Sequence, residues 1–260
     1  MADLYTVSAK YYDEAYASEP NQNDVSFYVE LARRAGGPVL ELACGTGRVL
    51  LPIARRGIAI HGVDSSPAML APLRRNLEGE TATVRELVTV SSGDLRSFRS
   101  EGRYPLIIIP FRPLQHMYTV EDQVATLKTA AFHLAPGGLL AFDVFYRFES
   151  MLSGIGEEKL ELQWTPRDDP AKTVCRYFRK DTIDKIAQNF TATYFYRTYE
   201  DNQVIKEETA PLKMSWYTYP HLRALFLLAG LEVVEEYGTF DKESLNNGSR
   251  EMIFILRRAQ

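Results

Sequence analysis

The order of apolar and polar segments between residues 23 and 147 predicts a parallel β-sheet with helical connections. Short runs of β-branched and apolar residues alternate with segments that have a helical pattern, which is typical of parallel strands with crossover helices. The run Leu-Ile-Ile-Ile at 106–109 is typical of a strand covered on both faces. The predicted strands span residues 39–43, 58–63, 88–91, 106–110 and 139–145. We therefore expect an α/β fold with a Rossmann-like, doubly wound, mostly parallel sheet.

The starts of three connecting helices are recognisable from the residues that cap them. Asp24 precedes an apolar face, and Ser66 is followed by a proline in the first turn. Thr119 has an acid three residues further on, which is a capping pattern. These signals agree with the strand positions.

After residue 150 the pattern changes to long strands in which apolar and polar residues alternate. Such strands, separated by residues that favour turns, predict an antiparallel insertion. A helix over 220–229 and two closing strands, 231–235 and 252–256, then complete the parallel fold. The strands of the insertion are predicted at 172–180, 187–199 and 204–213. We assign residues 1–150 and 218–260 to the Rossmann-like domain, and 151–217 to an insertion that shapes a substrate pocket or a dimer contact.

Composition and charge narrow the partners of the chain. Its 260 residues are 45% hydrophobic, which is enough for a real core, and a net charge of −4 provides no general basic surface for nucleic acid. The longest apolar stretches fall far short of the roughly 20 residues that cross a bilayer, so we expect no membrane span. Two cysteines form no disulfide framework and the leading segment has no apolar core, which predicts a cytoplasmic protein. Exposed edges of the long antiparallel strands favour pairing between chains as a homodimer.

The segment from Val39 to Gly47 runs a buried strand into a glycine turn and then into a helix predicted near Arg48. Gly45 and Gly47 remove side chains where a ligand must touch the backbone, and the helix offers free N–H groups. Asp64 follows at the end of the next strand, where a carboxylate accepts hydrogen bonds from both ribose hydroxyls. The spacing predicts a site for an adenosine ligand.

Two other interpretations compete for this turn. A Gly-x-Gly sequence alone is equally consistent with a structural turn. A dinucleotide site requires a third glycine, and Leu50 stands at that position. Asp94 and Pro110 follow the next two strands, and open α/β sheets bind ligands at these carboxyl ends. The set of strand ends thus favours a ligand site over a structural turn.

Four segments together resemble the successive motifs of class I S-adenosylmethionine-dependent methyltransferases. They are Glu41–Gly47, Gly62–Leu70, Gly93–Phe98 and Leu134–Gly138. The resemblance covers roughly residues 1–150 and 211–257, and it implies S-adenosylmethionine as the cofactor. It implies that the two glycines face the methionine part, that Asp64 takes the ribose, and that Asp94 with the Leu95 backbone takes the adenine. The cofactor-binding residues assigned in this way are Tyr12, Glu41, Ala43, Gly45, Gly47, Asp64, Ser65, Met69, Asp94, Leu95 and Pro110, and no metal site is assigned.

Methyl transfer from a sulfonium mainly requires alignment of acceptor, methyl group and sulfur, because the leaving group is already activated. A histidine suits the removal of a proton from an amine or a hydroxyl. We select His116, because its loop follows the fourth strand and leads towards the methyl end of the cofactor. A loop histidine that caps a neighbouring backbone group is an equal alternative. The other histidines lie within a strand or on helices, where packing roles are more common, and Cys44 is expected to be a packing residue.

The segment Phe111–Met117 is similar to the active-site loop of bacterial nucleotide-linked aminosugar N-methyltransferases, whose histidine acts near the amine. Tyr5–Asp13 resembles the N-terminal tyrosine helix of the same enzymes, which implies that Tyr5 and Tyr12 approach the methionine end and gives Tyr5 a catalytic role. Packing of an N-terminal helix is an equal alternative for both tyrosines. Arg112 departs from the small residues of the family loop, and we expect it to be a solvated loop residue.

The leading hypothesis is therefore an S-adenosylmethionine-dependent methyltransferase that acts on a nitrogen or oxygen of a small molecule. A nucleotide-linked aminosugar or another amine is the expected substrate class. The alternative is a non-catalytic protein that binds an adenosyl ligand or a partner on the same fold, because a fold alone does not fix function.

Overall fold

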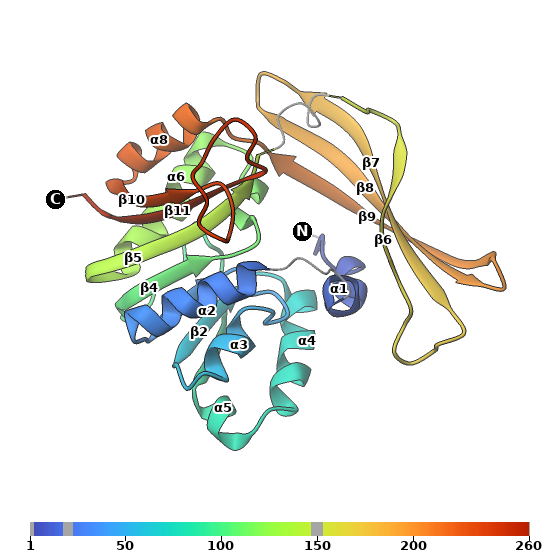
Figure 1. Cartoon of the computed structure of the whole chain (residues 1–260), viewed down its shortest axis with the longest axis horizontal. Helices are drawn as coiled ribbons and strands as arrows, with labels where there is room; N and C mark the ends of the chain where they lie inside the picture. The colour runs from blue at the N-terminus through green and yellow to red at the C-terminus, as the bar shows by residue number, and fades with distance from the viewer. Residues whose placement is uncertain (1–2, 18–22, 147–152, 260) are drawn as a thin grey trace. The chain divides into compact units, whose positions relative to one another are not determined.

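Parallel strands form the centre of the larger of two units in this structure, a computed structural model that describes residues 3–17, 23–146 and 153–259 (Figure 1). The order of strands in the sheet is β10-β11-β5-β4-β1-β2-β3. All neighbours pair in parallel except β11, which runs antiparallel to β5 and β10. The strands are β1 (Val39–Leu42), β2 (Ile60–Asp64), β3 (Val88–Ser92), β4 (Tyr104–Ile109), β5 (Leu134–Phe145), β10 (Leu231–Tyr237) and β11 (Glu251–Arg258). The predicted fold class is confirmed, and the strand order reverses direction between β1 and β4, where such sheets bind ligands.

Helices cover both faces of this sheet (Figure 1). Apolar residues of α6 and α8 pack on one face, and those of α2, α3 and α4 pack on the other. The run at 106–109 serves both faces: Ile107 and Ile109 join the first cluster, and Leu106 and Ile108 join the second. The helices are α2 (Asn23–Ala35), α3 (Leu50–Ala54), α4 (Pro67–Glu78), α5 (Ala82–Glu86), the 3-10 helix η1 (Pro113–His116), α6 (Val120–His133) and α8 (Tyr219–Leu228). In the described ranges no helix is long and apolar enough to cross a bilayer.

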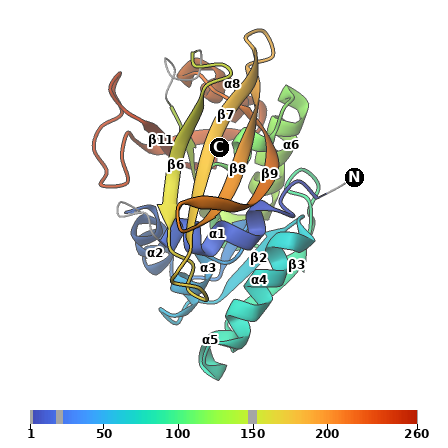
Figure 2. The ribbon, with the colours of Figure 1, turned by 90° about the vertical axis from the view of Figure 1, so that its right-hand side faces the viewer.

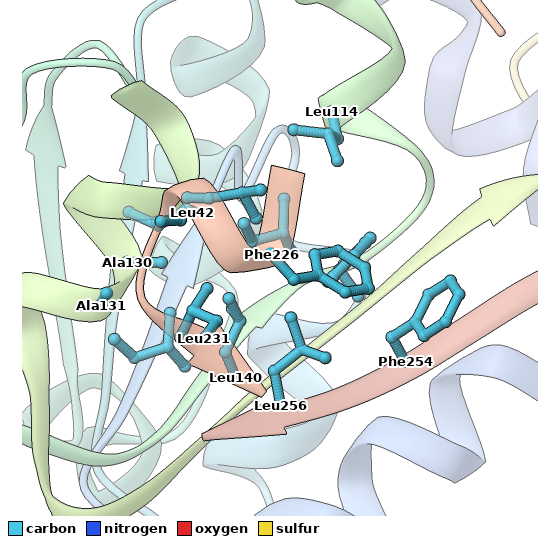
Figure 3. Packing of buried hydrophobic residues seen from close by; sticks show 14 of the residues in the cluster. Leu42, Leu114, Ala130, Ala131, Leu140, Phe226, Leu231, Phe254 and Leu256 are labelled. Atoms are coloured by element: carbon cyan, nitrogen blue, oxygen red, sulfur yellow. The ribbon is translucent and has the colours of Figure 1, made fainter. Parts of the chain in front are cut away.

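The cluster under α6 and α8 fixes the ends of the strands relative to one another (Figure 3). Phe226 of α8 packs edge-on against Phe254 of β11 at a centroid distance of 5.0 Å, and Phe142 of β5 stacks on the same ring at 5.7 Å. All three rings are almost fully buried. Because their burial contributes about 1.5–3 kcal/mol for each large side chain, this layer holds the sheet rigid beneath the loops at its carboxyl edge.

The caps predicted for two helices are confirmed. The Ser66 hydroxyl accepts a hydrogen bond from the Met69 N–H at the start of α4. The Thr119 hydroxyl accepts from the Asp122 N–H at the start of α6. The position of each helix relative to the preceding strand end is therefore set locally by one side chain.

The smaller unit consists of residues 1–21 and 148–215, within which an antiparallel sheet has the strand order β6-β7-β8-β9. Helix α1 (Ser8–Ala17) lies against one face of this sheet (Figure 2), where the Tyr11 ring stacks on Tyr196 at 4.5 Å. Through this packing the N-terminal residues group with the insertion, and the domain bounds given under the sequence analysis remain a prediction. The strands are β6 (Glu158–Trp164), β7 (Thr173–Asp184), β8 (Asn189–Glu200) and β9 (Gln203–Ser215).

A buried histidine at the end of α6 is held in its neutral form by two backbone groups. The His133 Nδ1 lies 2.8 Å from the Thr129 carbonyl oxygen, to which it donates, and its Nε2 accepts from the Ser100 N–H at 3.0 Å. The ring also stacks on Phe98 at 5.3 Å. Protonation of Nε2 would break the bond from Ser100, and burial lowers the pKa of His133 below its usual value.

Acid is expected to destabilise the protein through His133. Because the pKa is lower in the folded than in the unfolded state, the unfolded chain binds more protons once the pH falls below about 6.5. Stability is therefore present above that pH and is lost as the pH falls through the folded pKa. Urea unfolding at pH 7.5 and 5.5 should show a smaller loss for His133→Gln than for the wild type. Equal losses in both proteins would show that this histidine does not contribute.

Candidate active site

The glycine turn after β1 uses three residues in the left-handed backbone region, with φ of 60° at Ala43, 54° at Gly45 and 89° at Gly47. A Cβ on Gly47 would lie 2.4 Å from a Leu73 methyl carbon, so the absence of a side chain allows α4 to pack closely. The contact of Gly47 with the methionine part of the cofactor remains a prediction. A Cβ on Gly45 would meet only the end of the Met69 side chain, at 3.2 Å. A side chain at position 47 would therefore clash with the packing of α4, whereas one at position 45 would meet only the flexible end of a methionine.

The carboxylate of Asp64 joins the glycine turn to the loop after β2. Its Oδ2 accepts from the Gly45 N–H at 2.9 Å, and its Oδ1 accepts from the Ser66 N–H at 2.8 Å. The side chain stands at the last residue of β2, as the sequence predicts, and is 8% exposed. Each carboxylate oxygen has a second lone pair, so the same group can accept from ligand hydroxyls while it holds both loops. The neighbouring Ser65 is exposed.

A short helix follows the glycine turn. The sequence predicted a helix from near Arg48 with free N–H groups for the ligand, but α3 begins at Leu50 and has only five residues. Arg48 lies in the turn instead, and its guanidinium pairs with the buried Asp24 of α2 and stands 4.5 Å above the Phe111 ring. This arginine thus connects the glycine turn with the loop that follows β4.

Two buried polar atoms beside the turn have no hydrogen-bond partner among the described residues. They are the Glu41 Oε2, on a side chain that is 2% exposed, and the Thr46 hydroxyl oxygen. Burial, and to a lesser extent the nearby charges of Asp64 and Asp24, raises the pKa of Glu41, whereas Arg48 opposes the rise. An unpaired acceptor in the interior is costly, and a cationic or hydroxylated ligand relieves that cost. These two acceptors therefore fit a ligand that carries an amino group, as the methionine part of S-adenosylmethionine does.

Asp94 lies after β3, in the loop to which the family resemblance assigns the adenine contact. Its carboxylate accepts from the Arg96 N–H at 2.8 Å and forms an ion pair with the same guanidinium, which also contacts Asp122. The hydrogen bonds from Arg96 lower the pKa of Asp94, so the group remains ionised and can still accept from an amino group. Leu95 is buried. The contact of both residues with adenine remains a prediction.

The loop after β4 is formed by a buried Pro110, two residues in the left-handed region and η1. The φ angles are 66° at Phe111 and 71° at Arg112. His116 is half-buried at the end of η1. Arg112 is not the solvated residue that the sequence suggested, because its guanidinium is partly buried and pairs with Glu251 at the start of β11 at 2.6 Å.

The two predicted tyrosines belong to the smaller unit. Tyr12 lies in α1 with its ring 4.6 Å from that of Tyr16, and Tyr5 precedes the helix, where its N–H donates to Asp3. The approach of both tyrosines to the cofactor remains a prediction. The other histidines lie in β2, α6 and α8, and His61 bonds Tyr104 and Ser91. Cys44 is buried, and its sulfur lies 2.9 Å from where a Cβ on Gly62 would be, as expected of a packing residue.

The sequence analysis missed the buried acid Asp143 of β5. Its Oδ1 accepts from the Tyr28 hydroxyl at 2.6 Å and from the Phe111 N–H at 2.8 Å. The available signal was a single acid inside the otherwise apolar strand Leu139–Phe145. Its partners lie 115 and 32 residues away along the chain, so no local pattern identifies them.

Comparisons with known proteins find methyltransferases among the relatives of this chain. A family model described as a methyltransferase domain matches residues 39–138. A cypemycin N-terminal methyltransferase from a Streptomyces species is 25% identical over 86% of this chain and 84% of its own length. A Streptomyces venezuelae dTDP-3-amino-3,4,6-trideoxy-α-D-glucopyranose N,N-dimethyltransferase is 26% identical over 59% of this chain and 60% of its own length.

A similar solved structure is that of the CcbJ methyltransferase from Streptomyces caelestis. It is 25% identical, with a TM-score of 0.84, over 100% of this chain and 99% of its own. Several other curated relatives are matched over only 48% to 57% of their length. Residues 39–138 thus match a methyltransferase domain, and the likeness to the CcbJ methyltransferase extends over the whole chain. A solved amino pentose methyltransferase from Micromonospora echinaspora, with bound S-adenosylmethionine, is 22% identical with a TM-score of 0.74 over 95% of this chain and 96% of its own.

Proposed function

We propose that this protein transfers a methyl group from S-adenosylmethionine to an amine nitrogen of a small molecule. The observation that carries the proposal is the adjacency of two strand ends in the larger unit. β1 and β4 are parallel neighbours, so the glycine turn and the loop with His116 leave the same edge of the sheet. The contact of Arg48 with the Phe111 ring ties the two loops together. An acceptor held by the second loop is thus presented to a cofactor held by the first.

The proposed chemistry needs one proton-accepting side chain near the acceptor. The bound cofactor supplies a methyl group on a sulfonium, which the nitrogen lone pair attacks as the carbon–sulfur bond breaks. The acceptor nitrogen must lose a proton either before the attack, so that its lone pair is available, or after it, so that the methylated product is a neutral amine. The imidazole of His116 accepts that proton, because it is half-buried on a loop whose conformation is fixed.

Ubiquinone biosynthesis O-methyltransferases also match, over about half of their length, but the cypemycin enzyme is matched over 84% of its length and favours nitrogen. The names of the cypemycin and aminosugar enzymes both specify amine methylation, and the first of them is matched over most of both chains. The shared requirement of these acceptors is a primary or secondary amine on a larger polar molecule. We therefore propose an amine of this kind, with a nucleotide-linked aminosugar as the leading candidate.

A transfer assay with matched acceptors tests the proposal. The protein is incubated with S-adenosylmethionine labelled on the methyl group and with dTDP-linked 3-aminosugars, peptides with free N-termini, and dTDP-sugars carrying a hydroxyl in place of the amine. Label on an amine with none on the hydroxyl counterpart supports the proposal. Label on hydroxyl acceptors alone contradicts the choice of nitrogen. Binding of S-adenosylhomocysteine without transfer to any acceptor, including those in a cell extract, favours the non-catalytic alternative.

A further inference from the structure

The loop with His116 is held by a buried acid that lies outside the motifs of the sequence. Asp143 is 1% exposed, and a single oxygen, Oδ1, accepts from both the Tyr28 hydroxyl and the Phe111 N–H. Tyr28 is itself fully buried in α2. We infer that Asp143 is a positioning residue that fixes the backbone of residues 111–117, and thereby the imidazole of His116, for methyl transfer.

The backbone conformation beside the contact of Phe111 with Asp143 supports this inference. Phe111 and Arg112 are consecutive residues with φ of 66° and 71°. Residues other than glycine rarely adopt this left-handed region. Such a conformation persists only where the surroundings determine it. The Phe111 N–H of this strained pair is tethered to Asp143, and the Arg112 carbonyl accepts from the Gln115 N–H at 3.0 Å.

Both sides of the Phe111 residue are also engaged. Its ring lies 4.5 Å from the Arg48 guanidinium and 5.1 Å from that of Arg112, while its N–H is taken by Asp143. The charge of Arg112 also favours the ionised carboxyl of Asp143, although burial raises its pKa overall. The acid thus links α2, β5 and the strained turn through one oxygen atom.

Hydrogen bonds between side chains and backbone groups also hold the remainder of the loop. The Tyr217 hydroxyl donates to the Leu114 carbonyl at 2.6 Å, and the Gln123 side-chain amide donates to the Met117 carbonyl at 3.1 Å. Gln115, which is fully buried, accepts from the Phe145 N–H at 2.9 Å. With Asp143 these bonds hold the loop at both ends and in its middle. Removal of Asp143 is therefore expected to loosen the start of the loop and to shift the segment that contains His116.

The inference about kinetics rests on the proposed function, whereas the inference about loop geometry does not. Amide hydrogen exchange reads the loop in the absence of any acceptor, and turnover reads its consequence. Amide exchange therefore tests the loop geometry, and turnover tests the proposed function, independently of each other.

The experiment compares Asp143→Val with Asp143→Asn, which keeps an Oδ1 acceptor. The control variant is Thr126→Val, which removes a buried hydroxyl on α6. In Asp143→Val, exchange of the amides at 111–117 should accelerate at least about tenfold, as expected when a local structure opens more easily. Its kcat should fall about tenfold to a hundredfold, since small misplacements of a reacting group have effects of this size. S-adenosylhomocysteine affinity should fall much less than kcat, because Asp64 keeps its bonds to the Gly45 and Ser66 N–H groups. Asp143→Asn and Thr126→Val should resemble the wild type in all three.

If Asp143→Val does not fold, Asp143→Ser serves in its place, because its short hydroxyl cannot span the distance to the Phe111 N–H. Wild-type exchange at 111–117 in a folded Val or Ser variant overturns the inference. So does an Asn variant that is as impaired as the Val variant. Faster exchange with unchanged kcat supports the positioning of the loop and contradicts the role of His116 in the proposed function.

Discussion

Replacement of Asp64 by alanine is expected to weaken the binding of S-adenosylmethionine and S-adenosylhomocysteine by about a hundredfold or more. Hydrogen bonds to a charged group contribute about 1.5–3 kcal/mol each, and two ribose hydroxyls would lose such bonds. The variant also leaves the N–H groups of Gly45 and Ser66 without their carboxylate, so the glycine turn loses its tie to the loop after β2. Calorimetric titration of both ligands measures the effect.

Two further variants separate ligand contact from loop support. Asp64→Asn keeps an oxygen acceptor but loses the charge, so its affinity should fall between those of the wild type and the alanine variant. Glu80→Ala removes an acid that pairs with Arg55 at the surface, and it should bind like the wild type. A folded Asp64→Ala protein with wild-type affinity would show that the ribose lies elsewhere.

Replacement of His116 by alanine is expected to lower kcat by about a hundredfold or more, since a positioned general base contributes about 10²- to 10⁴-fold. Affinity for S-adenosylhomocysteine should stay within about threefold, because the residue lies on the loop after β4 and not in the glycine turn. The pH–rate profile provides the decisive comparison. In the wild type the rate falls on the acid side as the imidazole becomes protonated, and this limb should vanish in the variant.

His116→Gln keeps a polar side chain of similar reach but cannot accept the proton, so it should be as slow as the alanine variant. Recovery of most of the activity in His116→Gln would mean that the histidine orients the acceptor and does not act as a base. Equal losses of turnover and cofactor affinity in His116→Ala would assign the residue to support of the fold.

Local signals in the sequence were sufficient for the strands of the larger unit and for the helix starts at Ser66 and Thr119, because periodicity and capping depend on neighbouring residues. They failed for β6, whose residues are mostly exposed and show little alternation in burial. They also failed after the glycine turn, where the left-handed Gly47 and its packing on Leu73 delay the helix to Leu50.

The candidate site shows the same division. Asp64 could be placed from its position at a strand end, because that position follows from the order of strands and turns. The pairing of Arg48 with Asp24, of Arg112 with Glu251 and of Asp143 with Tyr28 could not, since each joins elements that are distant in sequence. Buried polar pairs of this kind depend on the tertiary fold and leave no periodic pattern in the chain.

The most direct test of the account is a crystal structure of the protein with S-adenosylhomocysteine. The ribose hydroxyls should lie within hydrogen-bonding distance of the Asp64 carboxylate, with the amino acid part beside Gly45 and Glu41 and the sulfur directed towards the loop of His116. A ligand bound at another edge of the sheet, or a ribose that contacts neither Asp64 nor the glycine turn, would contradict it.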